Sequence, residues 1–143
     1  MRNFLILLIV AAAFYGYYEK SSPTQSIDQT SSAVNQQIYN AYKHHQSDVQ
    51  VLGIGTVSRI LSDDLEGSQH QRFILRLDSG HTILIAHNID LAPKIYTLNQ
   101  GDTVEFYGEY KYNNKGGVVH WTHHDPSNRH EHGWLLHRGK RYE

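Results

Sequence analysis

Apolar and polar residues alternate along most of the chain after Val49. This period of two predicts β-strands, because successive side chains of a strand point to opposite faces of a sheet. Turn signals separate the alternating stretches, at Asp78–Gly80 and at Asn113–Gly117. Residues 88–98, with Pro93 near the middle, do not alternate and predict a short helical connection. Five strands are therefore expected, over residues 49–61, 70–77, 81–87, 103–112 and 117–122.

Three strands, a short helix and two further strands form the element order of an OB-fold, a five-stranded, partly open Greek-key barrel. Gly53 and Gly55 lie in the long first strand, where glycine permits the sharp coiling that a closed barrel requires. We therefore expect a mainly β protein, with an OB-fold-like barrel preceded by an N-terminal helix. An up-and-down sandwich, in which residues 88–98 form a loop, remains the alternative.

The N-terminal part of the chain has a different pattern. Residues 1–18 contain an uncharged, mainly apolar stretch after Arg2 and predict a signal peptide or an N-terminal membrane anchor. Residues 19–32 are rich in Ser, Thr and Gln and predict a linker. Apolar residues at helical spacing between Ser32 and His45 predict a short amphipathic helix at the start of a domain over residues 33–143. The domain is expected in the periplasm, or facing it from the inner membrane.

Charge and cysteine content limit the chemistry. A formal net charge of -1 argues against a general nucleic-acid coat protein, so any contact with nucleic acid requires a local basic patch. The chain has no cysteine, which excludes disulfides, thiolate metal sites and cysteine nucleophiles. A metal ion would therefore need histidine nitrogens and carboxylate oxygens as ligands.

Histidine is concentrated near the C-terminus, with six between His120 and His137. In an OB barrel, the end of strand one, the start of strand two and the ends of strands three and five meet at one pole. Several polar residues are expected to converge there: Asp63, Asp64, His70, Arg72, His87, Asn88, His123, His124 and Asp125. In an extended strand His123 faces away from His120 and His124, unless the chain bends near Thr122.

Two or three imidazoles with one carboxylate suit Zn or another divalent metal. The predicted ligands are His87, His123, His124 and Asp125. Without a metal, His123 or His124, oriented by Asp125, can act as a general base, while Arg72 stabilises developing negative charge. His70 is expected beside them and completes the set of predicted catalytic residues His124, Asp125, Arg72 and His70. Both arrangements predict a nuclease-like hydrolase that acts on nucleic acid or another phosphodiester.

A non-catalytic OB-fold module is the alternative function. It would bind nucleic acid, an oligosaccharide or a protein partner through Tyr107, Trp134 and the basic tail. A histidine-rich metal buffer is a third possibility. In these hypotheses Trp121 is interpreted as a core residue, and His130 and His132 as part of a solvated loop.

Several unusual strings support a family resemblance. They are Gly53-x-Gly-x-Val-x-Arg-Ile-Leu-x-Asp-Asp64, His70-Gln-Arg-Phe73, Ala86-His-Asn-Ile-Asp-Leu-Ala-Pro93, Lys115-Gly-Gly117 and His120-Trp-Thr-His-His-Asp-Pro126. From about Val51 to Tyr142 the chain resembles a bacterial family known as domain of unknown function 3465. The resemblance implies a small exported domain and carries over no activity.

Overall fold

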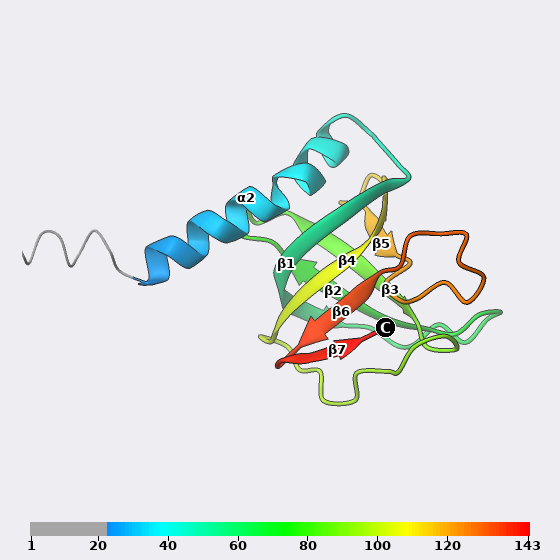
Figure 1. Cartoon of the computed structure of the whole chain (residues 1–143). Helices are drawn as coiled ribbons and strands as arrows, with labels where there is room; N and C mark the ends of the chain where they lie inside the picture. The colour runs from blue at the N-terminus through cyan, green and yellow to red at the C-terminus, as the bar shows by residue number, and fades with distance from the viewer. Residues whose placement is uncertain (1–22) are drawn as a thin grey trace, which may run out of the picture.

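One helix and seven strands make up residues 23–143, the part of the chain that the computed structural model describes (Figure 1). The helix α2 spans Pro23–Lys43. The strands are β1 Val49–Ile60, β2 His70–Arg76, β3 Thr82–Asn88, β4 Thr103–Lys111, β5 Val118–His120, β6 Trp134–His137 and β7 Lys140–Tyr142.

The first five strands close into a mixed barrel. β1, β2 and β3 pair as antiparallel neighbours, β3 pairs in parallel with β5, and β5 pairs antiparallel with β4. β4 then pairs antiparallel with β1 and completes the ring. The mainly β architecture and the five-stranded barrel are confirmed, and the closed ring of pairings rules out the sandwich.

β1 contributes to two sides of the barrel. Its residues 49–56 pair with β4, and its residues 56–60 pair with β2 across a register shift between Val57 and Arg59. Gly53 is required in the first half, because a Cβ at this position would overlap the ring of Phe106 and the end of the Ile38 side chain. The absent side chain leaves room for the Phe106 ring and the Ile38 side chain, which meet over the same face of β1.

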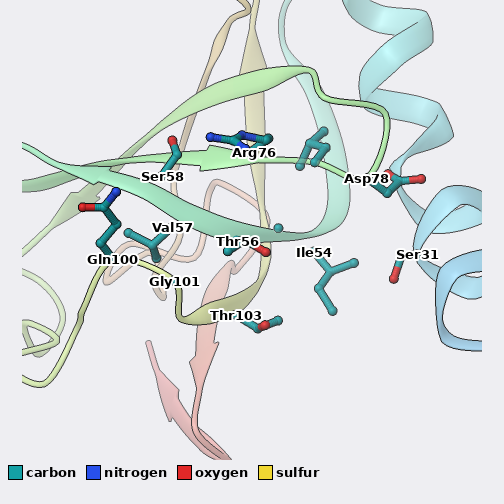
Figure 2. Close-up of a pocket in the computed structure, with 12 residues that line it drawn as sticks. Ser31, Ile54, Thr56, Val57, Ser58, Arg76, Asp78, Gln100, Gly101 and Thr103 are labelled. Carbon is teal, nitrogen blue, oxygen red and sulfur yellow. The ribbon is translucent and has the colours of Figure 1, made fainter. Parts of the chain in front are cut away.

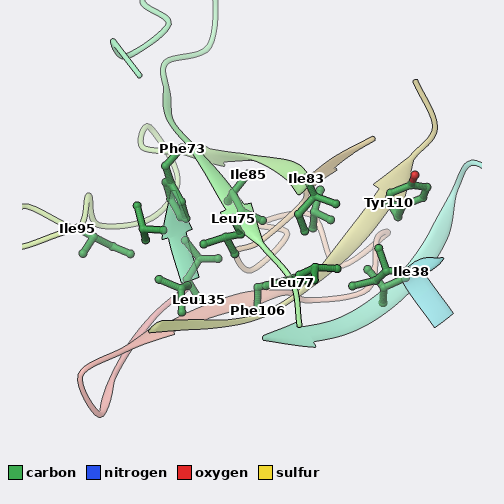
Figure 3. Packing of buried hydrophobic residues seen from close by; sticks show 14 of the residues in the cluster. Ile38, Phe73, Leu75, Leu77, Ile83, Ile85, Ile95, Phe106, Tyr110 and Leu135 are labelled. Carbon is green, nitrogen blue, oxygen red and sulfur yellow. The ribbon is translucent and has the colours of Figure 1, made fainter. Parts of the chain in front are cut away.

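Alternation along the strands fills the barrel with apolar side chains (Figure 3). Phe73 and Leu75 of β2, Ile85 of β3 and Phe106 of β4 are completely buried. Ile38 of α2 is also completely buried and joins this cluster. The C-terminal half of α2 is therefore part of the domain core, while its N-terminal half extends beyond the barrel (Figure 1).

The N-terminal prediction differs from the structure at one boundary. The helix begins at Pro23 and not at Ser32, so residues 23–31 of the expected linker are helical. The predicted signal peptide or anchor, residues 1–18, lies outside the described residues. Within residues 23–143, no helix has both the length and the apolar character needed to span a bilayer.

The short helix expected between the third and fourth strands is wrong, because residues 89–102 form turns. One helical-type bond, from the Ala92 amide to the Asn88 carbonyl oxygen, is not continued by others, and several amides bond to side chains instead. The amide of Ile95 donates to Gln71 Oε1 at 2.9 Å and not to a backbone carbonyl oxygen of a helix. The amide of Asp90 likewise donates to a side chain, to Asn88 Oδ1 at 2.9 Å. Pro93 has no amide hydrogen to donate and disfavours helical geometry in the residue before it.

Two further strands, β6 and β7, were not predicted. β6 pairs with the first half of β4, from Val104 opposite His137 to Tyr107 opposite Trp134, and β7 pairs with β6. Leu135 of β6 is completely buried in the core. The C-terminal segment is therefore an integral part of the domain.

Candidate functional site

The barrel gathers several predicted residues at one pole. His70 opposes Asn88 across β2 and β3, and an isolated bridge joins His70 to Asp64 in the loop before β2. A pocket of about 200 Å³ opens here. We name it the histidine pocket; it is lined by Ser68, His70, Asn88, Leu91, His120, Trp121 and His123.

A bend after β5 brings its C-terminal residues into this pocket. Trp121 has a φ of 55°, a left-handed conformation that is uncommon for residues other than glycine. The bend breaks the alternation of an extended strand, so that His120, Trp121 and His123 all line the same space. The sequence permits this arrangement only if the chain bends near Thr122, and the left-handed residue lies one position earlier, at Trp121.

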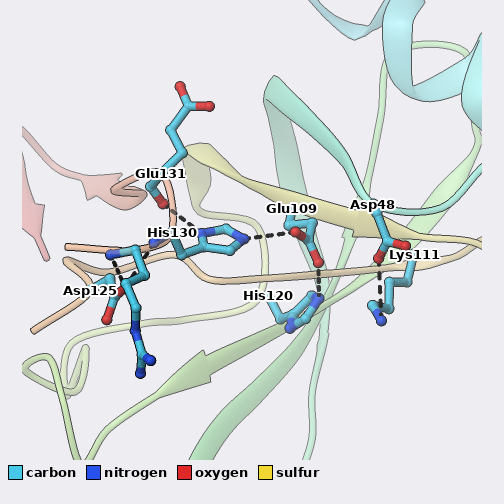
Figure 4. Close-up of polar contacts among 8 residues, drawn as sticks. Asp48, Glu109, Lys111, His120, Asp125, His130 and Glu131 are labelled. Atoms are coloured by element: carbon cyan, nitrogen blue, oxygen red, sulfur yellow. Dashed lines mark hydrogen bonds and ion pairs between the residues drawn. The ribbon is translucent and has the colours of Figure 1, made fainter. Parts of the chain in front are cut away.

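Glu109 of β4 connects two of the histidines (Figure 4). One carboxylate oxygen accepts from His120 Nε2 at 3.1 Å, and the other accepts from His130 Nε2 at 2.7 Å. His130 also donates from Nδ1 to the carbonyl oxygen of Glu131 at 2.8 Å. Because both ring nitrogens of His130 face acceptors, its ring is held as an imidazolium.

The local environment shifts the pKa values of these histidines in different directions. Burial opposes protonation of His130, but its bond to Glu109 outweighs that cost and raises its pKa. Burial lowers the pKa of His120 and of His123, and Glu109 offsets part of the effect at His120. The His130 ring stacks on Trp121 at a centroid distance of 4.1 Å and an angle of 8°, so a cation covers one face of the indole.

His87, a predicted metal ligand, lies completely buried inside the barrel. Its Nδ1 bonds to Thr122 Oγ1 at 2.8 Å, and its Nε2 donates to the carbonyl oxygen of Pro93 at 3.2 Å. Burial lowers its pKa to about 4. Both nitrogens are occupied within the protein, which leaves no lone pair directed at a metal ion.

Asp125 organises the loop that follows β5 and does not orient His124. Its carboxylate accepts from the hydroxyl and amide of Ser127 and from the amides of Arg129 and His130, at 2.8–3.0 Å. These bonds, led by those from Ser127, lower the pKa of the carboxyl group. His124 is exposed, and its Nε2 lies 3.4 Å from Glu143 Oε2.

The predicted site is therefore assembled only in part. His70, Asn88 and His123 share the histidine pocket, whereas His124 and Asp125 are absent from its lining. Within residues 23–143, no group of three or more histidine and acidic side chains is arranged to hold a metal ion. Asp63 forms an ion pair with Lys94.

Two residues that line the pocket, His120 and Trp121, were not predicted as site residues from the sequence. The supporting pair Glu109 and His130 was not predicted either. The alternation in Val118–His120 indicates that His120 points outward, as Val118 does. No local signal marks Trp121, because its position depends on the bend. Glu109 is distant from both histidines in the sequence, and only the folded structure brings it to them.

Beside the pocket, β2, β3 and β5 present a half-exposed apolar centre on the outside of the barrel. Ile74 opposes Leu84, which in turn opposes Val118. Arg72 and Arg76 flank Ile74 on the outward side of β2, and Arg59 lies opposite Ile74 on β1. We name this surface the arginine face; it comprises Arg59, Arg72, Arg76, Ile74, Leu84 and Val118.

The charged side chains on the arginine face are all positive. β1, β2, β3 and β5 contain no Asp or Glu, although the whole chain has 14 acidic residues. Within the described part of the chain, none of the three arginines forms an ion pair. Arg72 donates from Nε and Nη2 to the carbonyl oxygen of Ser62 at 3.1 and 3.0 Å, which fixes its guanidinium over the surface.

A larger pocket of about 540 Å³ lies near the other end of β2 (Figure 2). Ser31 of α2 and Ile54 of β1 lie on its helix side, and Arg76 and Asp78 border it where β2 ends. The arginine face therefore runs between two hollows, with the histidine pocket at the start of β2 and this pocket at its end.

The family described as a protein of unknown function (DUF3465) matches residues 21–143. The chain belongs to this family. No curated protein matches the chain. Membership in DUF3465 assigns no chemistry, so the function is argued from the arginine face and the histidine pocket.

Proposed function

We propose that the barrel is an OB-fold and that this domain binds single-stranded nucleic acid across the arginine face without cleaving it. The surface of strands two and three is where OB-folds bind oligonucleotides and oligosaccharides. The arginine face occupies that surface here. The observation that carries the proposal is a face with three arginines outside ion pairs, on four strands that contain no carboxylate.

The three arginines would bind the phosphates of the nucleic-acid strand. Arg72 and Arg76 are four residues apart on one strand, which places their backbones about 13 Å from each other. Arg59 extends the positive surface onto β1. Guanidinium groups bind phosphate oxygens in a planar, two-pronged geometry, and a phosphodiester chain along the face would contact the three in turn.

The apolar centre accounts for the preference for unpaired strands. Ile74, Leu84 and Val118 are half-buried and lie side by side on adjacent strands. A flat apolar surface beside cations favours bases that are free of a duplex, because their faces are then available for contact. An acidic polysaccharide would use the cations but not this surface.

Binding is tested by fluorescence anisotropy with a labelled oligothymidylate of about twelve nucleotides, at about 50 mM salt. The double variant Arg72→Ala/Arg76→Ala should bind on the order of tenfold more weakly, because two phosphate contacts are lost. Arg138→Ala/Arg141→Ala removes the same charge from the β6–β7 hairpin and should bind almost as tightly as the natural chain.

Three outcomes would contradict the proposal. They are no binding at low salt, an equal loss in the two double variants, or binding of heparin without binding of the oligonucleotide. A duplex of the same length serves as the control for strand state and should bind more weakly.

The hydrolase function remains a prediction, with less support from the geometry. Asp125 is engaged by its own loop, and His124 lies away from the histidine pocket. A phosphodiesterase assay with and without chelator tests it directly. Turnover that disappears in His124→Ala, with the fold retained, would favour the hydrolase over the binding module.

A further inference from the structure

Each of the three histidines that line the histidine pocket has one nitrogen tied to an acceptor. His70 Nδ1 lies 2.8 Å from the carbonyl oxygen of Ser68, and His123 Nδ1 lies 2.7 Å from that of His124. His120 Nε2 lies 3.1 Å from the carboxylate of Glu109. Carbonyl and carboxylate oxygens accept hydrogen bonds, so each of these nitrogens must carry the hydrogen.

The fixed hydrogen determines what the other nitrogen offers. A neutral imidazole has one donor and one acceptor nitrogen. In the neutral form of each ring, the three remaining atoms, His70 Nε2, His120 Nδ1 and His123 Nε2, are lone-pair acceptors. Across residues 23–143 they have no hydrogen-bond partner.

His123 is the most buried of the three histidines that line the pocket. Its side chain belongs to a residue that is only 3% exposed, yet Nε2 has no partner in the described structure. The fully buried side-chain atoms without a partner in the described residues are Gln50 Nε2 and His137 Nδ1. His123 Nε2 is not one of them, so it remains accessible from the pocket. The histidine pocket is the open space beside this side chain, so a ligand donor placed there would satisfy the atom.

One donor complements the three acceptors. Asn88 accepts from the amide of Asp90 through Oδ1 at 2.9 Å, which leaves its Nδ2 group available to donate into the pocket. The volume of about 200 Å³ exceeds that of an engineered cavity of roughly 150 Å³ that accepts benzene. The pocket therefore admits a planar heterocycle with several N–H groups and one oxygen acceptor.

We propose that the histidine pocket binds the hydrogen-bonding edge of an unpaired guanine. This inference rests on the proposed binding of single-stranded nucleic acid. Guanine offers N1–H and a 2-amino group to the imidazoles, and its O6 accepts from Asn88. Thymine and uracil have a single N–H between two carbonyl oxygens. Those oxygens would face the acceptor nitrogens of the imidazoles with no hydrogen between them. A strand on the arginine face reaches the pocket at His70, because His70 and Arg72 lie on the same side of β2.

Base preference is measured with oligothymidylates that carry one central dG, dI, dA or dC. The dG probe should bind about tenfold more tightly than the all-thymidine strand, since it adds two or three hydrogen bonds. Inosine lacks only the 2-amino group and should give an intermediate affinity. Equal affinities for the dG and all-thymidine strands would overturn the inference while leaving the proposed function intact.

His123→Ala should abolish the dG preference and keep the affinity for the all-thymidine strand. His70→Ala tests the same site at a more exposed position, in case the first variant does not fold. His132→Ala is the matched control, because His132 is exposed and bonds to Asn128 outside the pocket. A preference that survives both pocket variants would contradict the assignment.

A mononucleotide experiment separates the two proposals. Guanosine monophosphate should shift the side-chain NMR signals of His120 and His123 in the natural chain, and thymidine monophosphate should not. If no oligonucleotide binds but guanosine monophosphate still shifts these signals, the proposed function fails and the guanine pocket stands. If neither nucleotide shifts them, the guanine pocket is overturned whatever the oligonucleotides do.

Discussion

At the scale of single residues, the environment of each histidine decides its chemistry. His87, His123 and His130 lie within one region of the barrel. The first is buried and bonded at both nitrogens, the second has one free nitrogen, and the third is an imidazolium held by Glu109. Residue type alone therefore does not indicate which histidine is available to a ligand.

His87 should make stability depend on pH. Burial lowers its pKa from 6.5 to about 4. Between these two pH values, His87 is protonated in the unfolded chain and neutral in the folded chain. Stability is then highest above pH 6.5 and falls as the pH decreases toward 4, by an amount on the order of 3 kcal/mol. Urea unfolding at pH 7 and at pH values near 4.5 measures this loss.

His87→Gln should reduce that pH dependence, because an amide keeps a donor for Pro93 and an acceptor for Thr122 but does not titrate. His132→Gln is the control, since the His132 side chain is exposed. If the natural chain and His87→Gln lose equal stability between the two pH values, the assignment of this effect to His87 is wrong.

At the scale of secondary-structure elements, local signals were sufficient for the barrel strands. The alternation in residues 70–77 and 103–112 predicted β2 and β4 within one residue at each end. The same local reasoning failed for residues 88–98, where side chains such as Gln71 bind the backbone from another strand. It also missed β6, whose four residues form a strand only because β4 supplies an edge.

Gly53 is a position within β1 where an added side chain has no room. Gly53→Ala should destabilise the domain by about 1–3 kcal/mol, because the added methyl overlaps Phe106 and Ile38 and forces β4 or α2 to move. Thermal or urea unfolding measures the change. Thr56→Ala, at an exposed position of the same strand, should change stability by less than about 0.5 kcal/mol. A neutral Gly53→Ala variant would show that the contact relaxes without cost.

At the scale of the whole molecule, the distribution of charge matters more than its sum. The net charge of -1 gave no indication of polyanion binding. The arginine face nevertheless concentrates three cations on strands without carboxylates, while the acidic residues lie elsewhere. Such a face attracts phosphates at short range even in a protein that is almost neutral.

The salt dependence of oligonucleotide affinity reports how many phosphates the face contacts. With three arginines engaged, the logarithm of the association constant should fall with the logarithm of salt concentration with a slope of about -2. Arg59→Ala should make this slope shallower by about 0.7. Anisotropy titrations over a range of salt concentrations measure both values, and an unchanged slope would place Arg59 outside the interface.

The sequence alone was enough to establish the mainly β class, the five barrel strands and the convergence of His70, Asn88 and His123 at one pole. Those features follow from side-chain alternation and strand order, which are local or combine by simple pairing rules. Only the tertiary structure decided which histidines share a pocket and which nitrogen of each is free. That outcome depends on the backbone bend at Trp121 and on Glu109 reaching across from β4, and both arise from contacts between segments distant in sequence.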